Sequence, residues 1–150
     1  MDCGKSGQKI VYYYMKDGFL PDGTKIPDVP VVYLVLEVGE FRARGPAILD
    51  TGFDGGVYPN IDIVRLFEGT KPVKIVEFEN PLFQRSEFEV YVAKAYLYYR
   101  GGYVSIGDVN VYIPVEPELL SEEVIIGREV INRWKITLDS KAKVLHILFQ

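Results

Sequence analysis

The stretch AILDTGFDGG, residues 47–56, decides how the rest of the chain is interpreted. An apolar run ends at Asp50, and Asp50-Thr51-Gly52 begins a turn that further glycines follow. A carboxylate on such a turn is either a catalytic group or one more acidic residue of a surface loop. Because an Asp-Thr-Gly tripeptide arises by chance in roughly a few per cent of chains of this length, the rest of the sequence has to distinguish the two.

The composition predicts one folded, mostly β domain spanning residues 1–150. Of these residues 48% are hydrophobic, and the abundance of Tyr, Val and Ile favours strands. The net charge of −4, with no block of Lys or Arg, gives no reason to expect nucleic acid. Cys3 is the only cysteine, the N-terminus lacks the apolar core of a signal peptide, and no stretch approaches the ~20 apolar residues of a membrane span. We therefore expect a cytoplasmic protein without membrane contact.

Turn residues divide the chain into short predicted elements. Residues 31–50 predict a hairpin whose second strand ends at Asp50. Residues 60–69 predict a helix that Asn60 caps. Near the C-terminus, a buried strand at 124–126 leads into a second short helix, and two closing strands are predicted to pair around the turn at 139–141.

Residues 72–93 predict a projecting hairpin. Its link, NPLFQRS at 80–86, is short and joins two segments rich in strand-forming residues. In the second segment Phe88, Val90 and Val92 alternate with Glu87, Glu89 and Tyr91, which is typical of a strand with one buried face.

Two features half a chain apart together resemble the retropepsin-like aspartic proteases. One is the apolar strand that ends in DTG at 50–52, and the other is VIIG at 124–127 followed by a short helix. In that family the two strands cross beneath the active site, and the order of elements also matches. The resemblance implies a single-lobe, dimeric acid protease fold with a closed β-barrel-like sheet, a flap hairpin and one or two short helices. It begins near residue 29, so residues 1–28 are an N-terminal extension: a propeptide, an added strand or a partner-binding arm.

Two further positions match the retroviral members of the family. Asp54 and Arg128 stand in DTGFD and IIGR, where those members carry an Asp that pairs with an Arg. By this resemblance Asp54 binds the main chain of the substrate, and Arg128 steadies it. Ile126 and Gly127 would support the turn from below.

The resemblance implies an aspartic endopeptidase, with catalytic Asp50 on a turn completed by Thr51 and Gly52. Hydrolysis of an amide by two carboxylates needs one as base toward water and one as acid toward the carbonyl. The chain carries one such Asp, so a homodimer would bring two copies together. Thr51 would bond across the interface, and the closing strand at 143–149 would form the dimer sheet. A peptide or protein substrate is implied, and no metal or organic cofactor.

The sequence departs from the retroviral pattern at Phe53, where those enzymes carry Ala and pepsin-like ones Ser. Phe53 brings no hydroxyl to the ionised carboxylate, which predicts activity nearer neutral pH than in pepsin-like enzymes. Glu129 stands where Asn is frequent. We expect Phe53 to contact substrate together with Leu82 and Phe83, which lie in a flap link that has no glycine.

Two other functions compete with the peptidase. The fold could serve as a catalytically inactive dimer that binds peptides or acts as a scaffold. It could also be a structural subunit of a larger assembly in which residues 1–28 make the contacts. The only histidine, His146, has no cysteine or second histidine with which to form a metal site, so a structural role is expected for it.

Overall fold

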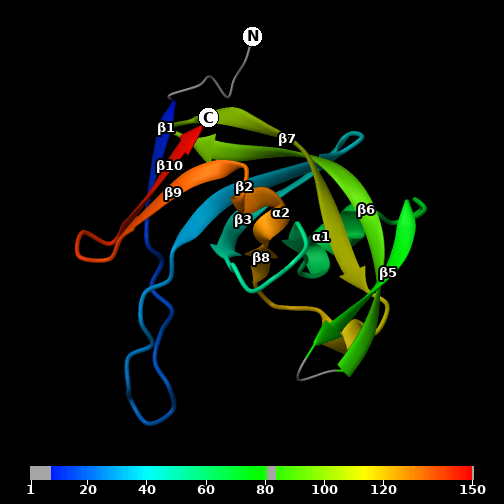
Figure 1. The fold of residues 1–150 in the computed structure, drawn as a ribbon, viewed down its shortest axis with the longest axis horizontal. Helices are drawn as coiled ribbons and strands as arrows, with labels where there is room; N and C mark the ends of the chain where they lie inside the picture. The colour runs from blue at the N-terminus through cyan, green and yellow to red at the C-terminus, as the bar shows by residue number, and fades with distance from the viewer. Residues whose placement is uncertain (1–7, 81–83, 150) are drawn as a thin grey trace.

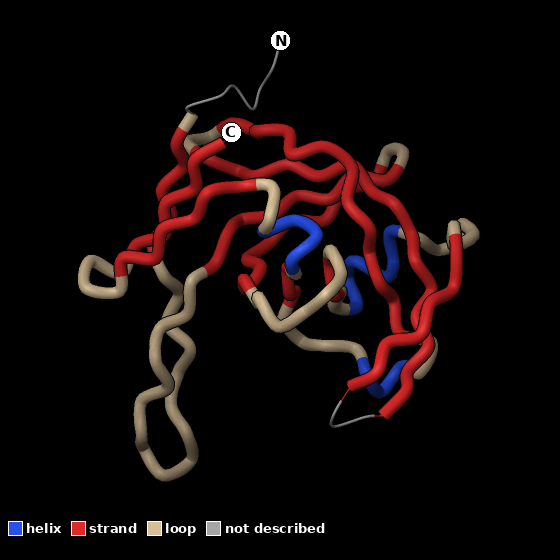
Figure 2. Tube along the Cα trace, viewed as in Figure 1, coloured by secondary structure: helices blue, strands red, loops and turns tan. Residues whose placement is uncertain are grey.

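The computed structural model describes residues 8–80 and 84–149, in which six strands close into a barrel (Figures 1 and 2). The six are β2 (Val31–Val38), β3 (Phe41–Leu49), β4 (Val57–Tyr58), β6 (Gln84–Tyr99), β7 (Gly102–Pro114) and β8 (Val124–Ile126). Hydrogen bonds join them in the order β2-β3-β8-β4-β7-β6, and β6 pairs back on β2. The predicted mostly β fold with a closed barrel is therefore present.

The predicted hairpin of 31–50 is confirmed. β2 and β3 pair antiparallel from Val38↔Phe41 to Val31↔Ile48, so β3 ends one residue before Asp50. β8 lies beside β3 in parallel, with Leu49 opposite Ile126. β4, which the sequence did not predict, has only two residues and fills the place between β8 and β7.

The projecting hairpin is also confirmed. β5 (Lys74–Asn80) pairs antiparallel with the first half of β6 and extends beyond the barrel, at the lower right of Figure 1. We name β5 and residues 84–90 of β6 the flap hairpin. Its tip, with the predicted substrate contacts Leu82 and Phe83, lies outside the described residues.

The predicted alternation in β6 holds for Phe88 and Val90 but is wrong for Val92. Phe88 and Val90 are buried in the flap hairpin, whereas Val92 is 42% exposed and its neighbour Tyr91 is buried. The buried face changes because this 16-residue strand serves two apolar clusters. From Tyr91 onward the inward residues pack into the barrel core instead.

The chain ends form a separate three-stranded sheet, which we name the terminal sheet (Figure 1, upper left). Its antiparallel order is β1 (Lys9–Tyr13), β10 (Val144–Phe149), β9 (Trp134–Asp139), and β9 and β10 flank the turn predicted at 139–141. One face packs on the barrel through Ile10, Leu145 and Ile147, all fully buried. Because β10 has a neighbour on both sides, the expectation that the closing strand forms a dimer sheet is wrong for β10 itself.

Part of the N-terminal extension is thus a strand added to a sheet. The rest, residues 16–28, forms a two-legged loop that projects away from the body, which we name the arm (Figures 1 and 2). Isolated bridges join Met15 to Val29 and Phe19 to Lys25. All residues from 18 to 25 are exposed, and Phe19 has 69% of its surface accessible.

The two predicted short helices are present as α1 (Ile61–Leu66) and α2 (Arg128–Ile131). Asn60 caps α1, since its side-chain oxygen accepts a hydrogen bond from the Ile63 N–H. A short 3-10 helix, η1, covers Pro117–Leu119. Within the part of the chain that the structure describes, no helix has the length and apolar character needed to cross a membrane.

Candidate active site

The turn that begins at Asp50 is held against β8 by backbone hydrogen bonds. The Asp50 N–H donates to the Ile126 carbonyl at 2.9 Å, and the Gly127 N–H donates to the Gly56 carbonyl at 2.8 Å. Arg128 N–H also donates to the Phe53 carbonyl, at 2.9 Å. Residues 50–56 are therefore bound at both ends and in the middle to the segment that sequence analysis placed beneath them.

The Asp50 side chain organises its own turn. One carboxylate oxygen, Oδ1, accepts a hydrogen bond from the Gly52 N–H at 2.8 Å, and the Asp50 carbonyl accepts one from the Phe53 N–H at 3.2 Å. Such local bonds are the reason that Asp is favoured in turns. The side chain is nevertheless exposed, so the carboxylate is both oriented and accessible.

Gly127 is required because two backbone segments meet at this position. A Cβ atom at Gly127 would lie 2.6 Å from the Phe53 carbonyl oxygen and would also collide with the Gly55 carbonyl oxygen. Both obstacles are backbone atoms that cannot move without displacing the turn. The Ile126-Gly127 pair thus supports the Asp50 turn from below, in the position that the sequence predicted.

Arg128 reaches across the turn to both of its sides. Its guanidinium donates to the Thr51 carbonyl at 2.8 Å and forms an ion pair with the Asp54 carboxylate. The Asp54 side chain is 63% exposed, so the pair contributes only about 0–1 kcal/mol to stability. Its structural effect is to join Thr51, Asp54 and the start of α2 into one unit.

A cavity of about 370 Å³ opens between the Asp50 turn and the flap hairpin, and we name it the flap-side cavity. Asp50 and Asp54 lie on its polar side. Most of its wall is apolar or aromatic, which is usual for ligand-binding pockets. Its lining is Asp50, Gly52, Phe53, Asp54, Tyr58, Phe78, Ser86, Phe88, Leu119 and Ile125.

Phe53 points into a cluster of aromatic rings on this wall. Its ring centroid lies 5.7 Å from that of Tyr58, 5.9 Å from Tyr112 and 6.3 Å from Phe78, in edge-to-face geometry. Each such pair contributes about 0.5–1.5 kcal/mol beyond burial. Sequence reasoning found Phe53 but missed its partners, because they come from β4, β5 and β7 and share no local motif.

Glu129 ties the cluster to α2. Its carboxylate accepts hydrogen bonds from the Tyr112 hydroxyl at 2.5 Å and from the Asn110 side-chain amide at 3.2 Å. Burial, reinforced by the neighbouring Glu129 charge, raises the pKa of Tyr112 above its ordinary value. The position that departs from the retroviral pattern thus has a structural partner in this chain.

A second cavity, of about 520 Å³, lies on the other side of the same turn, and we name it the sheet-side cavity. Asp50 and Thr51 line it together with Pro30, which precedes β2, and with residues at the ends of β3 and α2 and along β9. Apolar side chains dominate the rest of the wall. Its lining is Pro30, Leu49, Asp50, Thr51, Ile131, Asn132, Trp134, Ile136 and Leu138.

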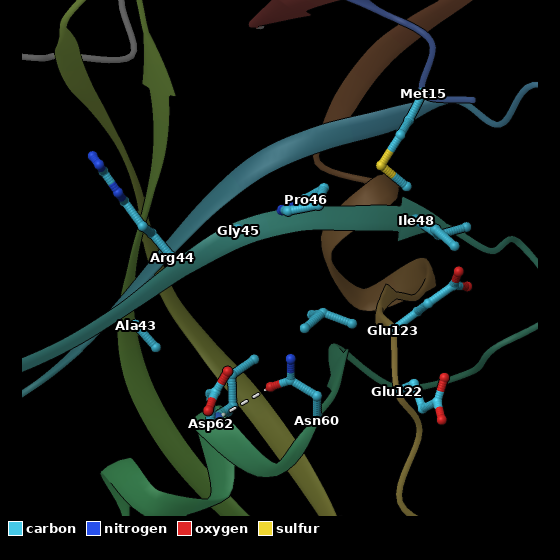
Figure 3. Close-up of a pocket in the computed structure, with 12 residues that line it drawn as sticks. Met15, Ala43, Arg44, Gly45, Pro46, Ile48, Asn60, Asp62, Glu122 and Glu123 are labelled. Atoms are coloured by element: carbon cyan, nitrogen blue, oxygen red, sulfur yellow. Dashed lines mark hydrogen bonds between the residues drawn. The ribbon is translucent and has the colours of Figure 1, made fainter. Parts of the chain in front are cut away.

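A third hollow, of about 290 Å³, is remote from Asp50 and lies between β3, α1 and the segment before β8 (Figure 3). Three carboxylates occur there, those of Asp62, Glu122 and Glu123, but Figure 3 shows that they do not converge. Within residues 8–80 and 84–149 no group of three or more His, Cys, Asp or Glu is placed to hold a metal ion. This hollow therefore has neither a nucleophile nor a metal-ligating cluster.

The structure brings together eight of the ten residues that the sequence singled out. No family model, no curated protein and no solved structure matches the chain. The eight residues are Asp50, Thr51, Gly52, Phe53, Asp54, Ile126, Gly127 and Arg128.

Proposed function

We propose that the chain is a retropepsin-like aspartic endopeptidase that acts as a homodimer through paired Asp50 carboxylates. The observation that carries this proposal is the placement of Asp50. An oriented, exposed carboxylate lies on a turn bound to Ile126-Gly127, between an aromatic-walled cavity and an apolar one. A surface loop needs neither the parallel pairing of β3 with β8 nor a glycine packed against the turn.

The proposed chemistry follows from two carboxyl groups that share one proton. Two carboxylates held close together cannot both ionise, so the pair titrates as a unit. The ionised Asp50 takes a proton from water while the water oxygen bonds to the peptide carbonyl carbon. The protonated Asp50 of the second copy donates its proton to the carbonyl oxygen. The first Asp50 then gives the proton it took from water to the amide nitrogen as the C–N bond breaks. The second Asp50 takes a proton from one hydroxyl of the tetrahedral intermediate, which leaves a carboxylic acid and an amine and returns the pair to one shared proton.

The flap-side cavity supports a substrate of extended conformation. The flap hairpin lies across the cavity from the Asp50 turn, and strands recognise extended peptides by main-chain hydrogen bonds and side-chain pockets. Phe53, Phe78 and Phe88 line the wall, so an apolar or aromatic substrate side chain should be preferred next to the cleaved bond. Asp54 offers an acceptor for a substrate amide.

Cleavage of a diverse peptide library between about pH 3 and 8, read by mass spectrometry, tests the proposal. The parent protein should cut at defined sites, and Asp50→Asn should lose at least about 1,000-fold in rate because it removes the base. Asp108→Asn is the matched control, since Asp108 is an exposed aspartate of β7 away from the turn. Equal cutting by the parent and Asp50→Asn would contradict the proposal.

The inactive peptide-binding dimer is kept as a second candidate because of Phe53. Its ring packs against three aromatic neighbours and presents no hydroxyl to Asp50. In that case neither the parent nor Asp50→Asn cuts, and both retain peptide binding and the mass of a dimer. Equilibrium binding to an immobilised peptide library distinguishes this function from the peptidase.

A further inference from the structure

The outer edge of β9 is open. β9 pairs only with β10 among the described strands, so one side of Trp134–Asp139 has backbone groups without a strand partner. The segment contains no proline, and its register against β10 is regular from end to end. Proteins commonly block exposed strand edges with bulges, proline or charge. β9 has no bulge or proline, and its two charged residues, Lys135 and Asp139, have opposite signs, so the edge can still serve as a template for another strand.

This edge adjoins the Asp50 turn. Trp134, Ile136 and Leu138 line the same sheet-side cavity as Asp50 and Thr51. Leu138 is 54% exposed although its cross-strand neighbour, Leu145, is fully buried. The barrel therefore covers only part of the apolar inner face of the terminal sheet. The uncovered part, at Leu138, lies beside Asp50, the residue that the proposed function pairs with a second copy.

The sequence of β9 is complementary to itself in one antiparallel register. Trp134, Ile136 and Leu138 face the barrel side, and Lys135, Thr137 and Asp139 face the opposite side. Faces match only when a residue pairs with one of the same parity. Among such symmetric registers, the one centred on Thr137 places Ile136 opposite Leu138 and Lys135 opposite Asp139. A shift by two residues in either direction loses the charge pairing.

We propose that β9 pairs antiparallel with β9 of a second copy of this chain, with Thr137 facing its own symmetry mate. The two terminal sheets then form one six-stranded sheet, in the order β1-β10-β9-β9-β10-β1. The apolar walls of the two sheet-side cavities close on each other, and the two Asp50 turns lie at the same interface. The proposal rests on the homodimer of the proposed function and adds the surface and register that build it.

Disulfide trapping tests the register. In a Cys3→Ser background, which removes the only native cysteine, Thr137→Cys should oxidise to a covalent dimer in high yield. Directly opposed residues have Cβ atoms about 4.5–5.5 Å apart, close to the reach of a disulfide. Ile136→Cys is the matched control, because its mate lies on the diagonal at about 7–8 Å. Mixing Ile136→Cys with Leu138→Cys should restore trapping.

Sedimentation of the parent chain measures its oligomeric state, and the trapping result is interpreted together with that state. A dimeric chain in which Thr137→Cys is trapped no better than exposed Thr24→Cys of the arm would overturn the β9 interface and leave the peptidase proposal standing. Self-trapping of Ile136→Cys in preference to Thr137→Cys would overturn the register. Trapping of Thr137→Cys in a chain that cuts no peptide would support the interface while the peptidase fails.

Charge reversal gives an independent measurement. Lys135→Glu places two like-charged pairs across the proposed interface and should raise the dimer dissociation constant about tenfold. Lys71→Glu makes the same change at an exposed position in the loop between α1 and β5, outside the proposed interface, and should leave the constant unchanged. Equal effects of the two variants would overturn the proposed pairing, since a general change in net charge would then explain both.

Discussion

The barrel and the terminal sheet solve the problem of strand edges in opposite ways. Each of the six barrel strands has a neighbour on both sides, because β6 returns to β2. Among the described strands of the terminal sheet, β10 alone has a neighbour on both sides, and β1 and β9 each have one edge without a strand partner. Closure makes the barrel a rigid support for the Asp50 turn. An open strand edge, in contrast, can pair with a strand of another chain. The barrel therefore positions the Asp50 turn, and the terminal sheet carries the edge through which we propose that the chain associates.

The largest expected effect comes from the point where the barrel holds the turn. Gly127→Val should cost more than about 4 kcal/mol or prevent folding, since its Cβ would meet backbone oxygens. Gly45→Val on β3 is the matched control, because nothing lies within 4 Å of a Cβ there. Urea unfolding of both variants measures the difference. Similar midpoints would show that the contact between Gly127 and the Asp50 turn is looser than its packing implies.

Leu138 on the open-edged strand β9 and Leu145 on the enclosed strand β10 are cross-strand neighbours, so substitutions at the two positions can be compared directly. Leu145→Ala should lower the free energy of unfolding by about 2–5 kcal/mol, because Leu145 is fully buried. Leu138→Ala should lower it by less than about 1 kcal/mol in the dilute monomer, since more than half of that side chain is exposed. Unfolding at several protein concentrations checks this. A concentration-independent loss at Leu138 as large as that at Leu145 would contradict the open edge.

Tyr112 should make the flap side of the barrel sensitive to alkaline pH. Its pKa is raised in the folded state, mainly by burial, so its contribution is present below the ordinary tyrosine pKa near 10 and is lost as pH rises above it. Tyr112→Phe should cost about 1 kcal/mol at neutral pH through the lost bond to Glu129, and should lose stability less steeply above pH ~10. Parallel denaturation curves at pH 7 and 10.5 measure both effects. Tyr13→Phe, at a 77% exposed position, should match the parent.

The elements that local sequence determines were predicted. Alternation and turn residues were enough for the 31–50 hairpin, the strand at 124–126 and the turn at 139–141. The Asp50 turn and its support at Gly127 were found because both carry short motifs. What a motif could not give is the packing between them, in which Gly127 N–H bonds to the Gly56 carbonyl.

Features that depend on distant partners were missed. β6 has one alternating pattern in sequence but changes its buried face between Val90 and Tyr91, because each half packs on a different cluster. Ser86, 8% exposed in the flap-side cavity, gave no signal, since a single serine in a strand carries no pattern. An added strand was one of three alternatives for residues 1–28, and nothing local indicated the partner of β1, because β10 lies at the other end of the chain.

The smallest effect on the free energy of unfolding is expected for the arm. Shortening the arm also tests whether association belongs to the open edge of the terminal sheet. Its legs are tied to each other, with the Leu20 N–H bound to the Thr24 carbonyl and the Ile26 N–H to the Gly18 carbonyl. Replacing residues 18–25 by an Asn-Gly turn should change the free energy of unfolding by less than about 0.5 kcal/mol, because it removes only exposed side chains. Urea unfolding measures this, and sedimentation of the same variant should still give a dimer if β9 provides the interface. A shortened chain that unfolds like the parent but sediments as a monomer would transfer the association from the β9 edge to the arm, where Phe19 and Leu20 are the exposed apolar side chains.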